Sequence, residues 1–313
     1  MKVLALAGGV GGAKLAAGLQ AVLGARELAV AVNTADDFDL WGLRICPDLD
    51  TVMYTLAGIS NPETGWGLAG ESFAALEMLA RYGEDAWFRL GDRDLATHVL
   101  RTARLRLGES LTRVTVDLSS ALGVESAILP MCDERVATVL ETPEGPLEFQ
   151  EYFVRRGQRD EVLGVELLGI EGARATNAVL GALDAVDLVV FCPSNPVVST
   201  GPILAVPGMR EAIEASGAPK VAVSPIVGGR ALKGPADKML ASLGHEVSAA
   251  GVARMYEGLV DGMVIDTVDE EDRRGIEALG MRVLETRAIM RDAPDRARLA
   301  REVIEFGAEL VSA

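Results

Sequence analysis

The chain has 313 residues, of which 49% are hydrophobic and 24% are charged, and its formal net charge is −16 at pH 7. This length and composition allow the core of one large or two ordinary domains, and they exclude a disordered or fibrous chain. The negative charge makes nucleic acid and anionic membranes poor partners, so any bound phosphate must be met by local N–H groups, a few basic residues or a metal ion.

The cysteines and the N-terminal segment indicate in which cellular compartment the protein is expected. Three cysteines lie far apart in the sequence and only two histidines are present, which indicates neither a disulfide framework nor a zinc site. The N-terminal apolar run is interrupted by glycines after about five residues, too early for a signal peptide. No stretch reaches the roughly 18 apolar residues of a membrane span. We therefore expect a cytoplasmic protein.

The first predicted element is a short apolar strand over residues 1–6, followed by the glycine-rich segment 7–14 and a helix. Glycines at such a junction leave no Cβ in the way of a ligand, and the first helical turn offers unpaired N–H groups. The segment is neither a dinucleotide fingerprint nor a P-loop, because Lys14 replaces the third glycine and no Ser or Thr follows it. One alternative is a glycine turn that only packs the helix against the sheet. We predict a phosphate site with these contributors: Gly9, Gly11, Gly12 and Lys14.

Aspartates cluster after the second predicted strand, residues 28–32. Open α/β sheets place ligands at the carboxyl ends of their strands, and clustered carboxylates beside phosphates suit Mg²⁺. Asp50 stands just before a helix expected to begin near Thr51, where an aspartate is also an ordinary N-cap or turn residue. We predict Mg²⁺ as a cofactor, with these candidate ligands: Asp36, Asp37 and Asp48.

Residues 66–124 show three apolar faces at helical spacing with no strand between them. This interrupts the β-α alternation, so we predict a helical lid over 66–124 inserted in a core made of 1–65 and 125–313. The connection between the first two helices holds Trp87, Phe88 and Arg89, which suit a planar ligand, although the two aromatic residues also fit a core. His98 has no evident partner, and we interpret it as a buried structural residue.

From Arg135 the apolar period changes to two, which predicts a β-hairpin near 135–154 and a strand over 165–170. Apolar strands over 187–191 and 220–223 then open into small, hydroxylic and amide residues, as in the crevice of a doubly wound sheet. To the phosphate site we add Ser194, Asn195, Ser224, Gly228, Gly229 and Lys233. Two more strands and a final helix complete an α/β fold, a Rossmann-like, doubly wound, mainly parallel sheet with an inserted helical subdomain and a β-hairpin.

Six of these motifs, in this order, resemble the 2-phospho-L-lactate transferase family of deazaflavin coenzyme F(420) biosynthesis. They are residues 8–15, 33–37, 45–51, 87–94, 193–196 and 224–229, and the resemblance runs along nearly the whole chain. Cys192 departs from the pattern, because a small polar residue is expected there. Gluconeogenesis-factor-like proteins of the same superfamily share the glycine segment and the Asp-Asp pair but lack two of the motifs. A nucleotide- or sugar-binding regulatory protein is therefore the alternative.

The resemblance implies a transferase with small-molecule substrates. It moves the phospholactyl or phosphoenolpyruvyl group of lactyl- or enolpyruvyl-2-diphospho-5'-guanosine to the ribityl hydroxyl of the deazaflavin Fo, releases GMP and requires Mg²⁺. In the family, Fo contacts the positions matched by Asp50 and Arg89, so Asp50 is the catalytic candidate, as a base or as a metal ligand. We also expect a homodimer. An NAD-dependent oxidoreductase, with Asp36 as its ribose partner, is a further alternative that the missing glycine at position 14 disfavours.

Overall fold

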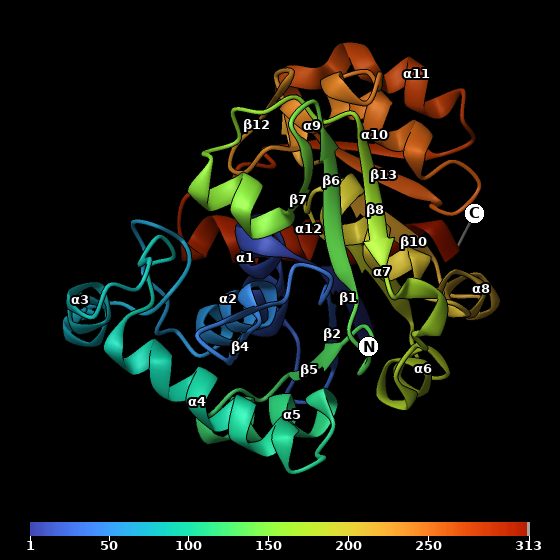
Figure 1. Cartoon of the computed structure of the whole chain (residues 1–313). Coiled ribbons are helices and arrows are strands. Elements are labelled where there is room, and N and C mark those ends of the chain that lie inside the picture. Colours follow the sequence, from blue (N-terminus) through green and yellow to red (C-terminus); the bar gives the residue numbers. More distant parts are fainter. Residues whose placement is uncertain (312–313) are drawn as a thin grey trace.

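The computed structural model describes residues 1–311 and shows a parallel sheet between two layers of helices (Figure 1). Seven strands form the sheet in the order β14-β13-β10-β9-β1-β2-β5, and all neighbours are parallel. The predicted α/β, doubly wound fold is thus confirmed. The strands are β1 (Val3–Ala7), β2 (Leu28–Val32), β5 (Ala127–Pro130), β9 (Leu188–Phe191), β10 (Lys220–Val223), β13 (Gly262–Asp266) and β14 (Arg282–Thr286).

Strand β1 lies inside the sheet, between β9 and β2, and is buried on both faces. Its side chains alternate between two core clusters, with Leu4 and Leu6 in one and Val3 and Ala5 in the other. Successive side chains of a strand point to opposite faces. A continuous apolar run is therefore what a parallel strand covered by helices on both sides requires.

Helices cover the two faces in separate groups. On one face α1 (Gly9–Val22) packs against α2 (Pro47–Leu56) and α12 (Ala293–Val311). The helices that bury apolar side chains on the other face are α6 (Asn177–Leu183), α7 (Gly201–Ala205), α8 (Met209–Ala215), α9 (Ala236–Ser242), α10 (Ala249–Met255) and α11 (Arg273–Glu277). Among the described residues, no helix is both long and apolar enough to span a membrane.

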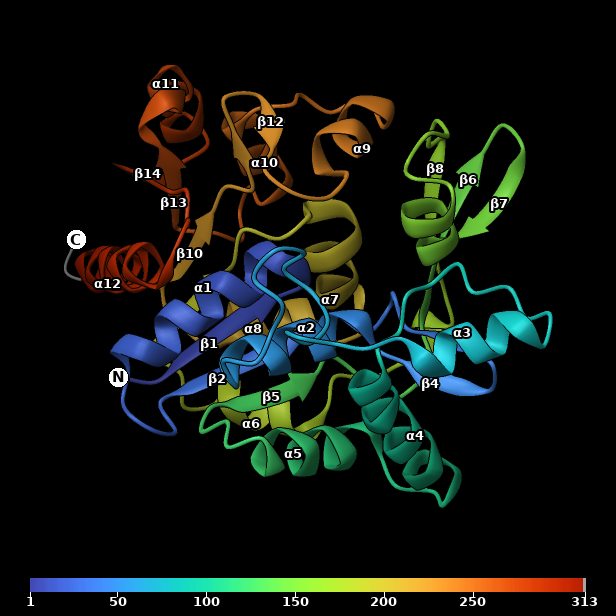
Figure 2. The same cartoon turned by 90° about the vertical axis from the view of Figure 1, so that its left-hand side faces the viewer.

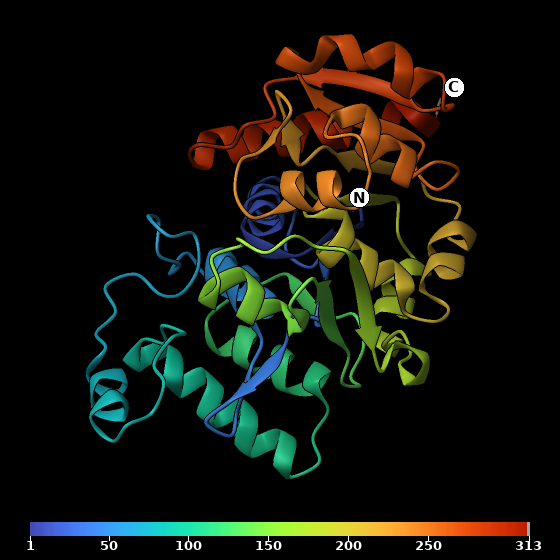
Figure 3. The same cartoon turned by 45° about the horizontal axis from the view of Figure 1, so that its top comes forward.

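The predicted run of three helices is present between the second and third strands of the central sheet. They are α3 (Ala74–Arg81), α4 (Asp92–Arg106) and α5 (Leu111–Ala121). The helical part begins at Ala74 and not near residue 66, because most of 57–73 is irregular. Helix α5 packs on strand β5, whereas α3 lies at the outer end of the molecule (Figures 2 and 3). The extent of a separate lid stays a prediction.

A second, antiparallel sheet stands beside α9 (Figure 2) and consists of β6 (Ala137–Thr142), β7 (Gly145–Glu148) and β8 (Gly164–Leu168). The predicted hairpin is confirmed, but its second strand ends at Glu148. Residues 151–155 form a single helical turn, η1 (Glu151–Arg155). The reason is the spacing of Phe149, Tyr152 and Phe153, because positions i, i+3 and i+4 share a face on a helix and not on a strand. Phe149 and Tyr152 are buried in one apolar cluster with Leu140.

Several elements were not predicted. The edge strand β5 was missed, and so were two hairpins, β3 (Phe38–Leu40) with β4 (Leu43–Ile45) and β11 (Ile226–Val227) with β12 (Arg230–Ala231). Helix α2 begins at Pro47 and not near Thr51, because proline is well suited to the first helical position. Asp48 and Asp50 consequently lie in the first turn of α2 instead of capping it.

Candidate active site

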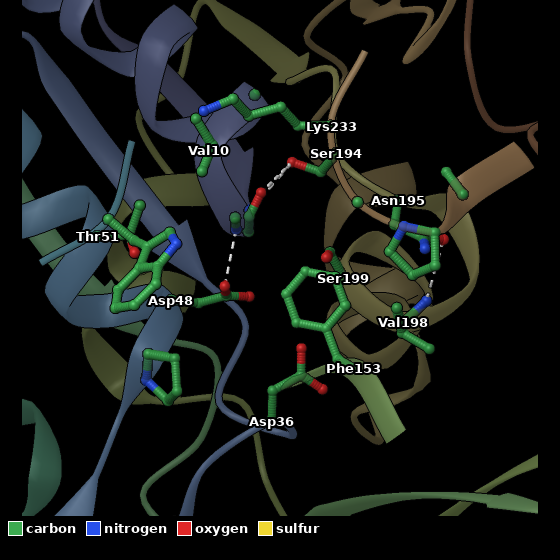
Figure 4. Close-up of a pocket in the computed structure, with 18 of the residues that line it drawn as sticks. Val10, Asp36, Asp48, Thr51, Phe153, Ser194, Asn195, Val198, Ser199 and Lys233 are labelled. Carbon is green, nitrogen blue, oxygen red and sulfur yellow. Dashed lines mark hydrogen bonds between the residues drawn. The ribbon is translucent and has the colours of Figure 1, made fainter. Parts of the chain in front are cut away.

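A cavity of about 440 Å³ opens beyond the carboxyl ends of strands β1 and β9. The sheet order changes direction here, since the chain runs from β1 to β2 and β5 on one side and from β9 to β14 on the other. Such a switch point is where open α/β sheets bind ligands. The glycine segment after β1 and the residues 193–195 after β9 both line the cavity, as Figure 4 shows for Ser194 and Asn195.

Helix α1 begins inside the glycine segment, so these glycines form its first turn. The N-cap residue is Gly8, which offers no side-chain oxygen to the first N–H groups. Gly9 has a φ of 62°, which glycine adopts without strain. A Cβ on Gly11 would lie 2.2 Å from the carbonyl oxygen of Pro193, so glycine is needed for this close approach. The end of α1 that faces the cavity is therefore open and partly positive, which suits an anion.

Ser194 holds the glycine segment against the loop after β9. Its Oγ accepts a hydrogen bond from the N–H of Gly8 at 3.0 Å and donates one to the carbonyl oxygen of Gly8 at 2.9 Å. A Cβ on Gly12 would lie 2.6 Å from the same Oγ. Gly12 therefore packs beneath Ser194 and does not line the cavity, so its place in the phosphate site stays a prediction.

Asp36 and Asp48 line the cavity from neighbouring segments, and their carboxylates lie near each other in the close-up (Figure 4). Asp48 accepts hydrogen bonds from the N–H of Gly9 at 2.8 Å and from Asn33 Nδ2 at 3.0 Å, yet burial raises its pKa to about 6. Burial and the charge of Asp48 raise the pKa of Asp36 well above its usual range, and its Oδ1 has no hydrogen-bond partner among residues 1–311. Two buried carboxylates in this state suit a divalent cation.

Asp37, the third predicted metal ligand, lies behind the wall of the cavity and does not line it. It is buried beside Cys46, and burial raises the pKa of its carboxyl to about 7 although the guanidinium groups of Arg101 and Arg44 oppose this shift. The two neighbouring aspartates thus face different surroundings, and only Asp36 is placed to meet a ligand in the cavity.

A network of buried polar residues forms another part of the cavity wall, where α2 meets α4. We call it the buried network, and it comprises Asp50, Tyr54, Asp94, His98 and Arg101. Arg101 donates hydrogen bonds to both carboxylate oxygens of Asp50, one of them from Nη1 to Oδ2 at 3.0 Å. His98 lies with Nδ1 3.7 Å from Asp50 and Nε2 3.3 Å from Asp94. His98 is buried, as expected from the sequence, but it has charged partners that the sequence did not indicate and it lines the cavity.

Three members of the buried network could also hold a metal ion, because ligand atoms of Asp50, Asp94 and His98 lie within 4.8 Å of one another. Arg101 already donates to Asp50, and its Nη1 lies 3.3 Å from His98 Nδ1. A cation bound there would be close to this fixed positive charge. Asp36 and Asp48 have no hydrogen bond or ion pair with a cationic side chain in the described part of the chain, so they fit Mg²⁺ better.

Two lysines lie near the open end of α1. Lys14 lines the cavity and donates from Nζ to the carbonyl oxygen of Met290 at 3.1 Å. Burial, together with the charges of Arg296 and Lys233, lowers its pKa. Lys233 donates to the carbonyl oxygen of Thr64 at 2.7 Å and thereby joins the segment before α3 to the loop after β12, close to Val10 (Figure 4). The other predicted positions on this wall, Asn195 and Ser224, also line the cavity.

The glycine pair Gly228 and Gly229 has a structural role. It forms the turn between β11 and β12, where both residues have positive φ, 58° and 72°. A two-residue hairpin turn of this kind requires positive φ at both central positions and so favours glycine. Neither glycine lines the cavity, so their place in the phosphate site stays a prediction.

Of the three residues predicted for a planar ligand, only Phe88 lines the cavity. Trp87 packs against Phe88 and Phe38, with ring centroids at 5.5 and 5.9 Å. Arg89 is exposed, and its guanidinium lies 4.4 Å from the ring centroid of Phe73. Neither Trp87 nor Arg89 lines the cavity in this structure, so their contact with a planar ligand stays a prediction.

Aromatic residues that the sequence did not indicate line the cavity instead. Phe149 lies between β7 and η1 and Phe153 lies in η1, and their rings stack with centroids 5.5 Å apart and planes 7° from parallel. The ring of Phe153 points into the cavity in the close-up (Figure 4). Their i, i+4 spacing was a usable signal, but the segment was interpreted as a strand.

The family model described as 2-phospho-L-lactate transferase CofD matches residues 3–299 of the chain. A phosphoenolpyruvate transferase of Streptomyces griseus is 45% identical over 99% of both chains. A 2-phospho-L-lactate transferase of Methanosarcina acetivorans is 39% identical to this chain. The alignment covers 96% of this chain and 98% of that protein.

A solved structure has the same fold at low sequence identity. It is a member of the UPF0052 family from Bacillus halodurans, which is 16% identical, superposes with a TM-score of 0.68 and covers 97% of this chain and 98% of its own. At this identity the similarity supports the fold alone. The relatives at 39–45% identity support the class of activity.

Proposed function

The chain belongs to the 2-phospho-L-lactate transferase CofD family and is a transferase, and from this premise we propose its substrates. The donor is a guanylyl diphosphate ester of a three-carbon acid, the acceptor is the deazaflavin Fo, and the products are GMP and a phosphodiester of coenzyme F(420) biosynthesis. The observation that carries the proposal is the open end of α1 beside Asp36 and Asp48, in a cavity that also holds aromatic side chains.

The donor diphosphate lies at the first turn of α1 in this proposal. Val10 and Gly11 line the cavity there, and Lys14 and Lys233 supply positive charge. The net charge of the chain is −16, so these local groups are needed to hold a polyanion. Ser194, Asn195 and Ser224 are then available for the rest of the guanylyl half.

Asp36 and Asp48 would hold the Mg²⁺ ion that accompanies the diphosphate. The buried Oδ1 of Asp36 lacks a partner among the described residues, and the raised pKa values show that both carboxyls are poorly solvated. A bound Mg²⁺ supplies neutralisation of the phosphate charge that grows in a phosphoryl transfer.

The acceptor ring lies at the aromatic wall made by Phe88, Phe149 and Phe153. Flat conjugated rings gain from offset or edge contacts with such side chains. The ribityl chain then extends toward Asp50, whose carboxylate lines the cavity on α2. The donor and the acceptor thus approach from opposite walls.

Asp50 takes the proton of the terminal ribityl hydroxyl in this arrangement. The hydroxyl oxygen forms a bond to the phosphorus that carries the acid group, and the bond from this phosphorus to the bridging oxygen breaks. GMP leaves with that oxygen. Each carboxylate oxygen of Asp50 accepts a hydrogen bond from Arg101 and retains a second acceptor position for the hydroxyl.

The acid of the donor is enolpyruvate in our proposal, because the relatives named phosphoenolpyruvate transferase are 45% and 44% identical and one named 2-phospho-L-lactate transferase is 39% identical. The test is an assay of the purified protein with Fo, Mg²⁺ and each donor in turn, in which GMP and the deazaflavin product are quantified. We expect equimolar GMP and product, with the enolpyruvyl donor the better one. GMP without deazaflavin product would contradict the acceptor. The homodimer and the cytoplasmic location stay predictions.

A further inference from the structure

Arg101 is a fully buried charged residue that the proposed chemistry does not use. Its side chain is 1% exposed and does not line the cavity. Its guanidinium forms a fork on the carboxylate of Asp50, with one hydrogen bond to each oxygen. Although burial disfavours the charged form, the charge of Asp50 raises the pKa of Arg101. Arg101 is therefore a permanent cation directly behind the carboxylate that faces the cavity.

The remaining members of the buried network hold Arg101 in turn. Its Nη1 lies 3.3 Å from His98 Nδ1, and because a guanidinium can only donate, His98 Nδ1 must be the acceptor. His98 Nε2 lies 3.3 Å from Asp94 Oδ1 and has no hydrogen-bond partner among the described residues. The hydroxyl of Tyr54 donates to this same carboxylate oxygen at 2.7 Å. Close contacts between polar groups thus link Asp50 to Tyr54 through Arg101, His98 and Asp94.

We propose that Arg101 is a positioning residue for Asp50 and that His98 orients Arg101 for this task. This inference rests on the proposed function of Asp50 in proton transfer. A fork of two parallel hydrogen bonds fixes both the position and the plane of a carboxylate, which a single contact from a lysine does not. The free acceptor positions of Asp50 are thereby aimed at the acceptor hydroxyl before the substrates bind, as efficient proton transfer requires.

The first experiment compares turnover in Arg101→Lys, which keeps the buried charge and loses the fork, with that in Arg104→Lys. Arg104 is the matched control because it lies on the same helix and forks onto Glu109, but it does not line the cavity or contact the buried network. We expect kcat to fall about tenfold or more in Arg101→Lys, with the donor KM within about twofold of wild type, and no change in Arg104→Lys. Unchanged kcat in a folded Arg101→Lys variant would overturn the proposal.

A double-mutant cycle tests whether Arg101 acts through Asp50. In the Asp50→Asn background, Arg101→Lys should cause no further loss of kcat, since the group that it positions is already gone. An equal loss in both backgrounds would overturn the proposal and leave the function of Asp50 intact. Full turnover in Asp50→Asn alone would instead remove Asp50 from the proposed chemistry, and the positioning role with it.

His98 provides a second pair of variants in case Arg101→Lys does not fold. The amide oxygen of His98→Asn can still accept a hydrogen bond near the position of Nδ1, whereas His98→Leu cannot. We expect kcat to fall in His98→Leu and to recover at least in part in His98→Asn, at similar thermal stability. Equal kcat in His98→Leu and wild type would contradict the orienting role.

Discussion

Asp48 and Asp50 are two residues apart in the first turn of α2, and both line the cavity, yet their surroundings differ. Among the described residues, the side chain of Asp48 accepts hydrogen bonds only from the neutral groups of Gly9 and Asn33, and burial raises its pKa to about 6. Asp50 is paired with the guanidinium of Arg101 through both oxygens. A carboxylate without a counter-charge attracts a cation, whereas one already neutralised is free for another use.

The cavity thus contains two kinds of acidic site. Asp36 and Asp48 are buried without a cationic partner among residues 1–311, so a ligand that supplies positive charge would stabilise their ionised forms. In the buried network Arg101 supplies this charge to Asp50 within the protein, although His98 Nε2 and Arg101 Nε have no hydrogen-bond partner among the described residues. We therefore assign the metal and the donor phosphates to Asp36 and Asp48, and we assign proton transfer to Asp50.

Removal of metal should have the largest effect. Because Asp36 and Asp48 depend on a cation to hold a diphosphate beside them, we expect transfer activity to fall below detection in excess chelator and to return when Mg²⁺ is added in excess. Product formation measured by chromatography checks this, with chelator already saturated by Mg²⁺ as the control. Full activity in excess chelator would show that the pair does not serve a metal.

Asp50→Asn should have the second largest effect on activity, because it keeps the shape of the side chain and removes its charge. We expect kcat to fall about a hundredfold or more, since general base catalysis contributes on that scale. The donor KM should change little, because the paired carboxylate of Asp50 is not needed for the cation. Steady-state kinetics with both substrates varied would separate the two parameters, and a loss confined to the donor KM would place Asp50 in the metal site.

Phe153→Ala should have a smaller, tenfold effect on one substrate only. It removes an aromatic face from the wall opposite α2, so we expect the KM for Fo to rise about tenfold, which corresponds to about 1.4 kcal/mol. Arg89→Ala is the matched control, because Arg89 lies on Phe73 outside the cavity and should leave this KM within about twofold. If Arg89→Ala raised the KM for Fo and Phe153→Ala did not, the acceptor would bind near residue 89 instead.

The smallest effect concerns Asp37, which burial keeps at a pKa of about 7, above its usual value. The native state therefore binds more protons than the unfolded state, so this carboxyl stabilises the fold at low pH and the contribution is lost as the pH rises through about 7. We expect Asp37→Asn to raise Tm relative to wild type by about 2–4 °C at pH 8, on the order of 1 kcal/mol, and by less at pH 5. Thermal unfolding across this pH range measures it, and an equal difference at both ends would contradict the assignment.

Local patterns were enough to predict the sheet and one side of the site. The strands over 28–32 and 220–223 and the strand, glycine and helix order at the N-terminus agree with the structure. Each of these depends on residues that are close in the chain, and parallel strands buried on both faces have a distinctive apolar run. Lys14 and Ser194 were proposed because they lie in segments that follow predicted strands. Both line the cavity, as does Asp48, and their roles stay predictions.

Contacts between distant residues could not be predicted in this way. Asp50, which pairs with Arg101, lies on another helix, and no local pattern indicates that pairing. The contacts of His98 with Asp94 and Arg101 are between neighbours on one helix, so their spacing was a usable signal that was not used. Gly228 and Gly229 show a different difficulty, because a glycine pair has the same appearance in a hairpin turn and in a phosphate loop. Residues 149–153 were assigned to a strand because a short apolar segment fits both periods.

The most direct test of the division between the two acidic sites is a calorimetric titration of GDP into three proteins, with and without Mg²⁺. We expect wild type and Asp50→Asn to bind GDP with similar affinity when Mg²⁺ is present and weakly when it is absent. Asp48→Asn should bind weakly in both conditions. The account would be contradicted if Asp50→Asn lost Mg²⁺-dependent binding while Asp48→Asn kept it.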